Sequence, residues 1–375
     1  MFLPLPETDE KRIRDAAVRF GDQHLRPHAI EDDENAHFRR EAFNEMAKEK
    51  LTCLVVPEEF GGQGLSHLCY YGCLEEVARA SGAMAVTAGV TNLVQGALTQ
   101  FGTADQKEKY LKRLVTGEYL GAFSLSESAS GSDAASLKTA ARRVPGGYRI
   151  TGTKMWCSTA GHADLYLLMA RTAEDRTKGI SSFLISRDTP GFRIGKMEKK
   201  LGLSASSLAE LIFEDCFVPE DRRLGDEGQG LAVALSQLDG GRITIGAAGV
   251  GLAIEAIERV WRYYEEVRGE MPENVRYAAA YGYAECQAVR LLIRVAALEK
   301  DARRSITAIA AQAKLMGSDL AMRVTSQAIE WMGEAGYRRE HEIERLFRDA
   351  KALQIVEGTN QIQRLVITRE MERML

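Results

Sequence analysis

The sequence predicts an α+β protein that is mainly helical, with a β domain inserted between two helical regions. Apolar residues recur at helical spacing near both ends of the chain. Between residues 119 and 228, short β-rich runs separated by turn signals such as "PGG" and "TPG" replace that pattern. The chain of 375 residues is also too long for one ordinary core. We therefore expect an N-terminal all-α domain over 1–118, a middle β domain over 119–228 and a C-terminal helical bundle over 229–375.

Composition and charge exclude several classes of protein. The chain is 45% hydrophobic and 27% charged, as globular proteins are. Its net charge of −4 offers no basic field for nucleic acid. The six cysteines form no CxxC motif and no Cys/His cluster with metal-ligand spacing, so we expect reduced thiols, no metal site and a cytoplasmic protein. The N-terminal segment becomes charged too early for a signal peptide.

The N-terminal region is expected to be helical over residues 7–50, where Ile13, Ala17 and Phe20 recur at helical spacing among charges. Proline and paired glycines in "VPEEFGGQGLS" (56–66) then predict a loop. Residues 80–104 contain no charge, which is long enough for a membrane helix. Their Ser, Thr, Asn, Gln and Gly content is too polar for one, so we expect a buried helix and no membrane insertion.

The middle region opens with "GAFSLSESASGSDAASLKTAARR" (121–143), in which six serines surround Gly131 and Asp133. This stretch is either a polar loop leaving a strand or a cradle for an anion or cofactor, in which backbone N–H groups and hydroxyls meet the ligand. It matches neither GxGxxG nor GxxxxGK[ST], so the sequence supports neither a Rossmann fold nor a P-loop. Trp156 follows, beside Cys157, Ser158 and Thr159. A tryptophan next to hydroxyls suits a flat heteroaromatic ring, although a core tryptophan is commoner.

The C-terminal region begins with a long predicted helix from Gly230 to Val267. Its many small residues, as in "GAAGVGLAIEA" (246–256), allow close helix packing in a bundle or at a subunit interface. Near the end, Glu357 stands in "QIVEGTNQIQRL", between β-branched apolar residues and a glycine. Apolar surroundings raise the pKa of a carboxyl group toward the range of a general base. The alternative is a carboxylate at a helix end with no role.

Five motifs in this order resemble those of the acyl-CoA dehydrogenase family, and the resemblance covers nearly the whole chain. The motifs are "VPEEFGGQGLS", "AFSLSESASGSDAAS", "KMWCSTAGHADLYLLMAR", "LDGGR" and "RLFRDAKALQIVEGTNQIQRLV". The resemblance implies an N-terminal helical domain, a middle β-barrel or sandwich and a C-terminal four-helix bundle. It also implies a flavoenzyme that uses FAD to form an α,β double bond in an acyl-CoA thioester.

In that resemblance Glu357 matches the catalytic glutamate of the family's "EGT" motif, which removes the α-proton while the β-hydride goes to the flavin N5. The Glu357 backbone N–H and a flavin ribityl hydroxyl would bind the thioester oxygen and stabilise the developing enolate. Some members hold the base on the helix that begins near "LDGGR". Gly241 occupies that place here and cannot act as a base, so Glu357 is the only candidate at either position.

The resemblance also implies binding residues, position by position. The expected cofactor-binding residues are Phe123, Leu125, Ser126, Gly131, Ser132, Trp156, Cys157, Ser158, Thr359 and Gln361. The expected substrate-binding residues are Ser132, Asp239, Arg242, Gly358 and Met84. Met84 occupies the place where glutaryl-type enzymes carry an arginine for a distal carboxylate, so we expect a neutral acyl chain. We separately expect that chain to be short or branched.

The chain departs from the family at contacts that reach the flavin of a neighbouring subunit. Val267 falls where the arginine of an "RxxFG" motif belongs, and Arg268, one residue away, is the expected substitute. Glu330 and Glu334 replace the usual glutamine and glycine of "QxxGG", and acids near a pyrophosphate repel it unless they point away. These departures have three explanations. FAD is held by other contacts, the dimer is rebuilt, or the protein is a paralogue without redox activity.

Three functions are therefore weighed. The first is an FAD-dependent acyl-CoA dehydrogenase that passes electrons to an electron-transfer flavoprotein. The second is an acyl-CoA oxidase, which returns the flavin to its oxidised form with oxygen. The third is a non-catalytic acyl-CoA-binding protein on the same fold, favoured by the altered cross-subunit motifs and opposed by Glu357, Trp156 and Ser126. The family resemblance further implies a homodimer or homotetramer.

Overall fold

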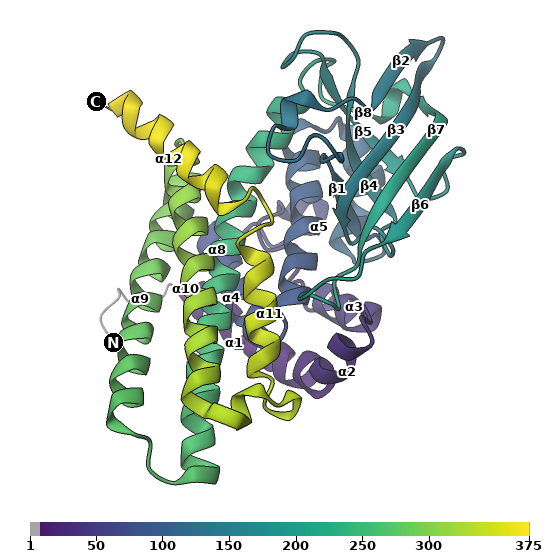
Figure 1. Ribbon diagram of the computed structural model, residues 1–375. Helices are drawn as coiled ribbons and strands as arrows, with labels where there is room; N and C mark the ends of the chain where they lie inside the picture. The colour runs from purple at the N-terminus through teal and green to yellow at the C-terminus, as the bar shows by residue number, and fades with distance from the viewer. Residues whose placement is uncertain (1–7, 375) are drawn as a thin grey trace.

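A computed structural model describes residues 8–374 and shows a helical body with a β domain on one side (Figure 1). The helices are α1 (Thr8–Phe20), α2 (Ala29–Glu34), α3 (Arg40–Lys48), α4 (His67–Ala80), α5 (Gly82–Phe101), α6 (Ala104–Gln106), α7 (Lys112–Val115), α8 (Gly230–Tyr263), α9 (Glu273–Asp301), α10 (Thr307–Met332), α11 (Ile343–Leu353) and α12 (Asn360–Met374). The strands are β1 (Gly121–Ser124), β2 (Ala140–Val144), β3 (Gly147–Ser158), β4 (Leu165–Arg171), β5 (Ile180–Ser186), β6 (Phe192–Met197), β7 (Leu208–Pro219) and β8 (Arg223–Leu224). The predicted order of helices, strands and helices is confirmed.

The first helical region is not one helix over residues 7–50, as the spacing predicted. After α1 the chain passes through a π-helical turn and a 3₁₀ turn that contains Pro27, and α2 ends at Glu34. Ala36 then takes a left-handed conformation with φ +49°, and α3 starts at Arg40. A regular helix cannot pass through such a residue, because its backbone reverses hand there. Residue 7, the first of the predicted helix, and residues 1–7 of the segment judged not to be a signal peptide lie outside the described residues.

The uncharged segment forms α5, and most of its side chains are buried. Ser81 caps its N-terminus by accepting a hydrogen bond from the Met84 N–H at 3.1 Å. A Thr103–Gln106 capping box starts the next helix. No helix among residues 8–374 is long and apolar enough to cross a membrane. The expectation of a buried helix at residues 80–104 is therefore confirmed.

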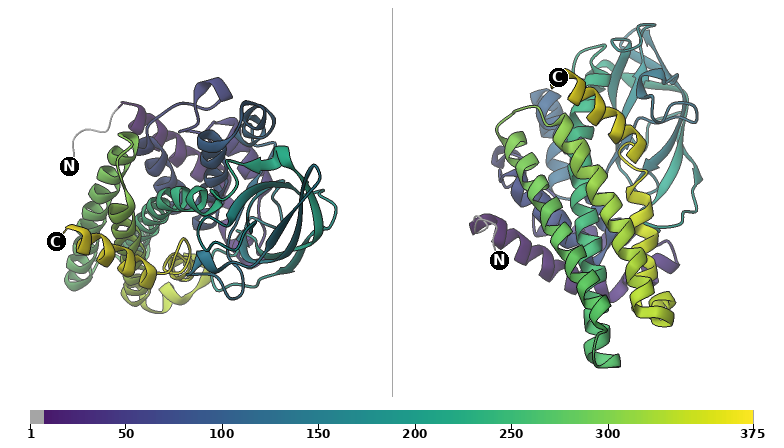
Figure 2. Two further views of the ribbon diagram at one scale, coloured as in Figure 1. Left: turned by 90° about the horizontal axis from the view of Figure 1, so that it is seen from above. Right: turned by 60° about the vertical axis from the view of Figure 1, so that its left-hand side comes forward.

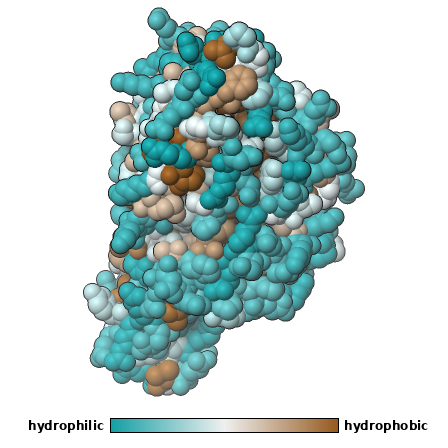
Figure 3. Space-filling model, turned by 90° about the vertical axis from the view of Figure 1, so that its right-hand side faces the viewer, coloured by the Kyte–Doolittle hydropathy of each residue, from teal (hydrophilic) through white to brown (hydrophobic). Residues whose placement is uncertain are grey.

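The β domain is a single sheet in the order β6-β7-β3-β2-β4-β5-β8, with β1 added in parallel beside β4. Strand β4 is buried on both faces, which explains its uninterrupted apolar sequence. Leu165, Leu167 and Met169 join a core with α5, whereas Tyr166 and Leu168 join a core inside the domain. The predicted "PGG" turn is present, with Gly146 at φ +81° between β2 and β3. The outer surface on this side is mostly hydrophilic, with scattered apolar residues (Figure 3).

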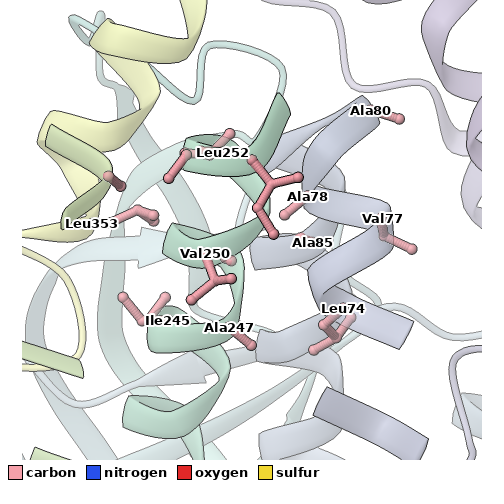
Figure 4. Close-up of a cluster of buried hydrophobic side chains, with 14 of the residues drawn as sticks. Leu74, Val77, Ala78, Ala80, Ala85, Ile245, Ala247, Val250, Leu252 and Leu353 are labelled. Carbon is pink, nitrogen blue, oxygen red and sulfur yellow. The ribbon is translucent and has the colours of Figure 1, made fainter. Parts of the chain in front are cut away.

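Helix α8 runs through the middle of the helical body, beside α4 and α10 (Figures 1 and 2). Its small residues let neighbouring backbones approach closely: a Cβ at Gly246 would meet the Ala313 carbonyl oxygen of α10 at 2.6 Å. A Cβ at Gly251 would meet the Glu75 carbonyl oxygen of α4 at 2.3 Å. Val250 and Leu252 fill the space between these contacts (Figure 4). All of residues 246–256 are buried within one chain, so they pack inside the bundle. The alternative prediction, that they form a subunit interface, is wrong.

Candidate active site

A cavity of about 400 Å³ lies where the sheet meets the helical body. It is enclosed by α5, α8, the end of β3, the serine-rich loop after β1 and the loop between α11 and α12. Its lining includes eleven predicted site residues: Phe123, Leu125, Ser126, Gly131, Ser132, Trp156, Ser158, Arg242, Glu357, Gly358 and Thr359. Segments more than 200 residues apart in the sequence thus meet at one place.

Trp156 presents its indole ring to this cavity instead of packing in a core. It lies at an irregularity in the pairing of β3 with β7, between Lys154 and Cys157, and has φ +59°. A bulged residue redirects its side chain out of the regular alternation of a strand. As a result the ring is 54% exposed on the cavity wall, near the hydroxyl-bearing residues Ser126 and Ser158. This arrangement suits a flat, polar-edged ring.

A buried ion pair holds the serine-rich loop against the sheet. Lys154 is fully buried, and its Nζ donates to the Leu125 carbonyl at 2.9 Å and to Glu127 Oε1 at 2.8 Å. Glu127 also accepts the N–H groups of Lys138 and Thr139, at 2.7 and 2.8 Å. Burial lowers the pKa of Lys154 to about 8, whereas for Glu127 the nearby ammonium outweighs burial and lowers its pKa. The loop that carries Leu125 and Ser126 is therefore fixed from behind.

Glu357 lies between α11 and α12 in a left-handed conformation, with φ +55°, followed by Gly358 at φ +86°. The fully buried Gln363 holds this turn, because its Nε2 donates to the carbonyl oxygens of Glu357 and Gly358 at 3.1 and 2.8 Å. The Glu357 side chain faces the cavity, but its Oε2 is enclosed and has no hydrogen-bond partner among residues 8–374. Burial raises the pKa of Glu357 to about 7, against the opposing effect of Arg242 and Lys314. Such a carboxyl group can take up a proton near neutral pH.

Only Arg242 and Glu357 carry charge among the residues that line the cavity in the described part of the chain. Arg242 donates to Asp239 Oδ1 at 2.6 Å, and the other oxygen of Asp239 accepts the Thr307 hydroxyl at 2.9 Å. Asp239 therefore lies behind the wall and does not line the cavity. The remaining wall is largely apolar and comes from α5, α8 and shorter segments that include Ile355 and Val356.

Five predicted site residues do not line the cavity, and Asp239 is the first of them. Cys157 is buried, with its Sγ 3.4 Å from the Phe123 carbonyl oxygen. Met84 lines a separate, smaller cavity beside Asp349. Gln361 is exposed at the start of α12. Arg268 is also exposed, and its Nε donates to the Tyr263 hydroxyl at 3.0 Å.

The two acids of the altered "QxxGG" motif lie at the surface. Glu330 is exposed near the end of α10, and Glu334 forms an ion pair with Arg338 in the turn that follows. A guanidinium beside the Glu334 carboxylate offsets its charge, although an exposed pair contributes little to stability. For Glu334, the predicted repulsion of a pyrophosphate is thereby reduced.

Sequence reasoning about individual residues missed much of the apolar wall. From α5 it includes Val86, Gly89, Val90 and Leu93, and from α8 it includes Leu235, Leu238, Thr244 and Ile245. Gly89 allows close approach of the two helices, because a Cβ there would meet Thr244 Cγ2 at 2.9 Å. The only signal was the uncharged segment itself, which contains Met84, one of the expected substrate-binding residues. Helical periodicity does not indicate which of two buried faces borders a cavity.

Comparison with protein families places nearly all of the chain in one group. Family models match "Acyl-CoA dehydrogenase, N-terminal domain" at residues 7–118, "middle domain" at 122–216 and "C-terminal domain" at 228–372. The mouse mitochondrial short-chain specific acyl-CoA dehydrogenase is 37% identical over 98% of this chain and 91% of its own length.

Solved structures agree with this assignment. Butyryl-CoA dehydrogenase from Megasphaera elsdenii superposes with a TM-score of 0.96 at 34% identity, covering 100% of both chains. A glutaryl-CoA dehydrogenase from Mycobacterium smegmatis, solved in complex with FADH2, superposes with a TM-score of 0.92 at 26% identity and covers 97% of this chain and 95% of its own.

Proposed function

The chain belongs to the acyl-CoA dehydrogenase family, and we propose that it oxidises a neutral, short or branched acyl-CoA to the α,β-unsaturated thioester with FAD as cofactor. The observation that carries the proposal is the Glu357 carboxyl group. It faces the cavity, has an enclosed oxygen without a hydrogen-bond partner among residues 8–374, and has its pKa raised by burial to about 7. An unpartnered buried oxygen is costly, and a proton taken from a substrate relieves that cost.

Glu357 acts as the base that removes the α-proton. Because burial raises its pKa, the carboxylate is a stronger base than an exposed one, while a large fraction stays ionised near pH 7. Gln363 fixes the backbone of residues 357 and 358, so the carboxylate is held in one place relative to the cavity. Holding the base in position supplies part of the rate through orientation.

The residues on the sheet side of the cavity fit a flavin. Trp156 offers the exposed face of its ring, and the hydroxyl-bearing residues Ser126, Ser158 and Thr359 line the same space. Gly131 lies open: its chain neighbours aside, no atom of residues 8–374 lies within 4 Å of a Cβ built there, so a ligand can approach its backbone. FAD bound there supplies the acceptor for the β-hydride. The chain itself orients the ring through the loop that Lys154 and Glu127 hold in place.

The substrate is a neutral acyl chain. Among residues 8–374, no positive charge on the cavity wall is free for a distal carboxylate, because Arg242 is paired with Asp239. The walls from α5 and α8 suit an apolar chain through burial of its surface. Met84, expected on the wall, lies beside another cavity, and the α5 residues that do line this one, Val86, Gly89, Val90 and Leu93, are all uncharged and apolar.

The protein assembles into a homo-oligomer. Five exposed apolar side chains form the α9 stripe: Tyr277, Tyr281, Leu291, Val295 and Leu298. Their spacing follows the heptad pattern of packed helices. Helix α12 projects beyond the helical body (Figures 1 and 2), and none of its described residues after Gln363 is buried. Such surfaces are typical of subunit interfaces. In this reading the adenosine half of FAD is held by contacts other than the family's "RxxFG" and "QxxGG" motifs.

The protein works in the cytoplasm and passes electrons to an electron-transfer flavoprotein. All six cysteines are buried, and none of them forms a disulfide with another residue of 8–374, which is compatible with a reducing compartment. The acceptor is the one that the family resemblance implies.

The first experiment is a visible absorption spectrum of freshly purified protein, repeated after anaerobic addition of a panel of acyl-CoA thioesters. We expect a flavin spectrum that bleaches with one class of neutral chain. A protein that stays colourless with added FAD would overturn the proposal and favour a non-catalytic acyl-CoA-binding protein. Peroxide formation without an added acceptor would reassign it as an acyl-CoA oxidase.

A variant tests the base. Glu357→Gln removes the proton acceptor and keeps the shape of the side chain, so we expect turnover to fall by about 10²–10⁴-fold while flavin and acyl-CoA still bind. Wild-type turnover in this variant would show that another group is the base.

A further inference from the structure

Helix α10 carries a fully buried lysine, Lys314, that has no part in the mechanism above. Its Nζ donates to Asn360 Oδ1 at 2.6 Å, and among residues 8–374 this is its only hydrogen-bond acceptor. An ammonium group has three donor hydrogens, so two are left without a partner. A buried cation with one hydrogen bond is costly, which raises the question of what it does there.

Asn360 connects Lys314 to the turn that carries Glu357. It is the first residue of α12, three positions after Glu357. Its Nδ2 donates to Ser318 Oγ at 3.0 Å and to Asp319 Oδ1 at 2.7 Å, both on α10. Gln354, three positions before Glu357, donates to the same Asp319 oxygen at 2.6 Å. Both ends of the Glu357 turn are thus tied to the one turn of α10 that begins with Lys314.

The titratable groups that act on Glu357 lie on three helices packed around it. Arg242 on α8 and Lys314 on α10 are the cations that act on it, and Tyr70 on α4 is the other titratable group coupled to it. Arg242 is already paired with Asp239, whereas Lys314 has only a neutral amide as its partner. Burial lowers the pKa of Lys314 to about 7, against the attraction of Glu357 and Asp319. The Glu357 carboxylate is therefore the buried anion best placed to compensate the Lys314 ammonium.

We propose that Lys314 is a positioning residue for the base: its ammonium anchors the Glu357 turn through Asn360 and keeps the Glu357 carboxylate in its charged, proton-accepting form. The inference rests on the proposed function in treating Glu357 as the base. A nearby cation favours the ionised carboxylate, which lies ready before substrate binds. Once Glu357 has accepted the α-proton, its carboxyl group is neutral and no longer compensates the Lys314 ammonium. The uncompensated buried charge favours release of one proton from these two groups.

The test measures the protonation of Glu357 directly. Infrared difference spectra of the holoprotein, recorded as the pH is stepped, show the carbonyl stretch of the protonated Glu357 carboxyl group, identified by its loss in Glu357→Gln. Lys314→Gln removes the charge and keeps a donor for Asn360, whereas Lys314→Met removes both. Lys351→Gln is the matched control: Lys351 also bonds to the Glu357 turn, through Gln354 Oε1 at 2.9 Å, but it is exposed on α11, where solvent screens its charge.

We expect the pKa of Glu357 to rise by about one unit or more in both Lys314 variants and to stay unchanged in Lys351→Gln. The pH profile of flavin reduction by acyl-CoA should move upward by the same amount in Lys314→Gln. An unchanged Glu357 titration in folded Lys314→Gln would overturn the proposal. So would failure of both variants to fold, because Lys314 would then serve the fold and not the base. Wild-type turnover in Glu357→Gln would refute Glu357 as the base, whereas the infrared titration separately tests whether Lys314 sets the charge of that carboxyl group.

Discussion

Gly241 on α8 lies directly against the carboxyl group of Glu357, and a Cβ at position 241 would meet Oε2 at 2.7 Å. No side chain other than hydrogen fits at 241 while Glu357 keeps its position. The family resemblance assigns position 241 to the base in some members and position 357 in others. The close contact gives a physical reason for this alternation, because both positions reach the same point in the cavity.

Gly241→Ala should lower turnover by about 10²-fold, because displacing a catalytic group by about 1 Å costs that much. Helix α8 is otherwise preserved, since alanine favours helix over glycine. The measurement is flavin reduction by acyl-CoA in stopped flow, with flavin content determined in parallel. Gly282→Ala on α9 is the control, because its Cβ would meet its nearest neighbour, Val324 Cγ2, at an ordinary 3.4 Å. Equal activity in both variants would show that Glu357 does not depend on the space at 241.

The rate of flavin reduction should depend on pH through Glu357. Its folded-state pKa is raised by burial to about 7, so the proton-accepting form is depleted below that pH. We therefore expect kcat/KM to rise with pH through about 7 and then to level off. The residual activity of Glu357→Gln should not show this rise of kcat/KM with pH. A profile that falls with rising pH over the same range would contradict the role of Glu357 as base.

Lys154→Met should destabilise the β domain and weaken flavin binding. Removing the ammonium leaves Glu127 as a partly buried carboxylate without its cation, which costs about 3 kcal/mol in free energy of unfolding. The loop with Leu125 and Ser126 loses its anchor at the Leu125 carbonyl. Urea unfolding and the Kd for FAD measure the two effects. The double variant Lys154→Met/Glu127→Gln should recover part of the stability, and an unchanged urea midpoint in the single variant would refute the argument.

Leu291→Glu should weaken self-association. Leu291 is 43% exposed in the α9 stripe, and a charge there is left unpaired and desolvated when a second copy covers the stripe. Light scattering coupled to size exclusion gives the mass: the wild type is expected as a dimer or tetramer, and the variant as a smaller species. Leu201→Glu is the control, since Leu201 is 60% exposed outside α9. Wild-type mass for both variants would place the interface elsewhere.

The sequence predicted the order of helical and β regions because periodicity changes from helical to strand-like within the chain itself. The uncharged segment and the "PGG" turn were predicted correctly for similarly local reasons. The single helix over residues 7–50 was wrong, because apolar spacing continues across Ala36, where the backbone turns left-handed. The small residues of 246–256 indicated close packing without indicating the partner, which proved to be α4 and α10 of the same chain.

By itself the sequence determined the family, the fold class and the glutamate that resembles the base, because these depend on local patterns and on ordered motifs. Only the tertiary structure decided which side chains meet. It brought Trp156, Gly241 and Glu357 to one cavity and left Asp239 behind its wall and Met84 beside another. It also set the buried Lys314 behind the turn of the base. The physical reason is that burial and charge coupling arise between segments far apart in the chain, and no local pattern contains those distances.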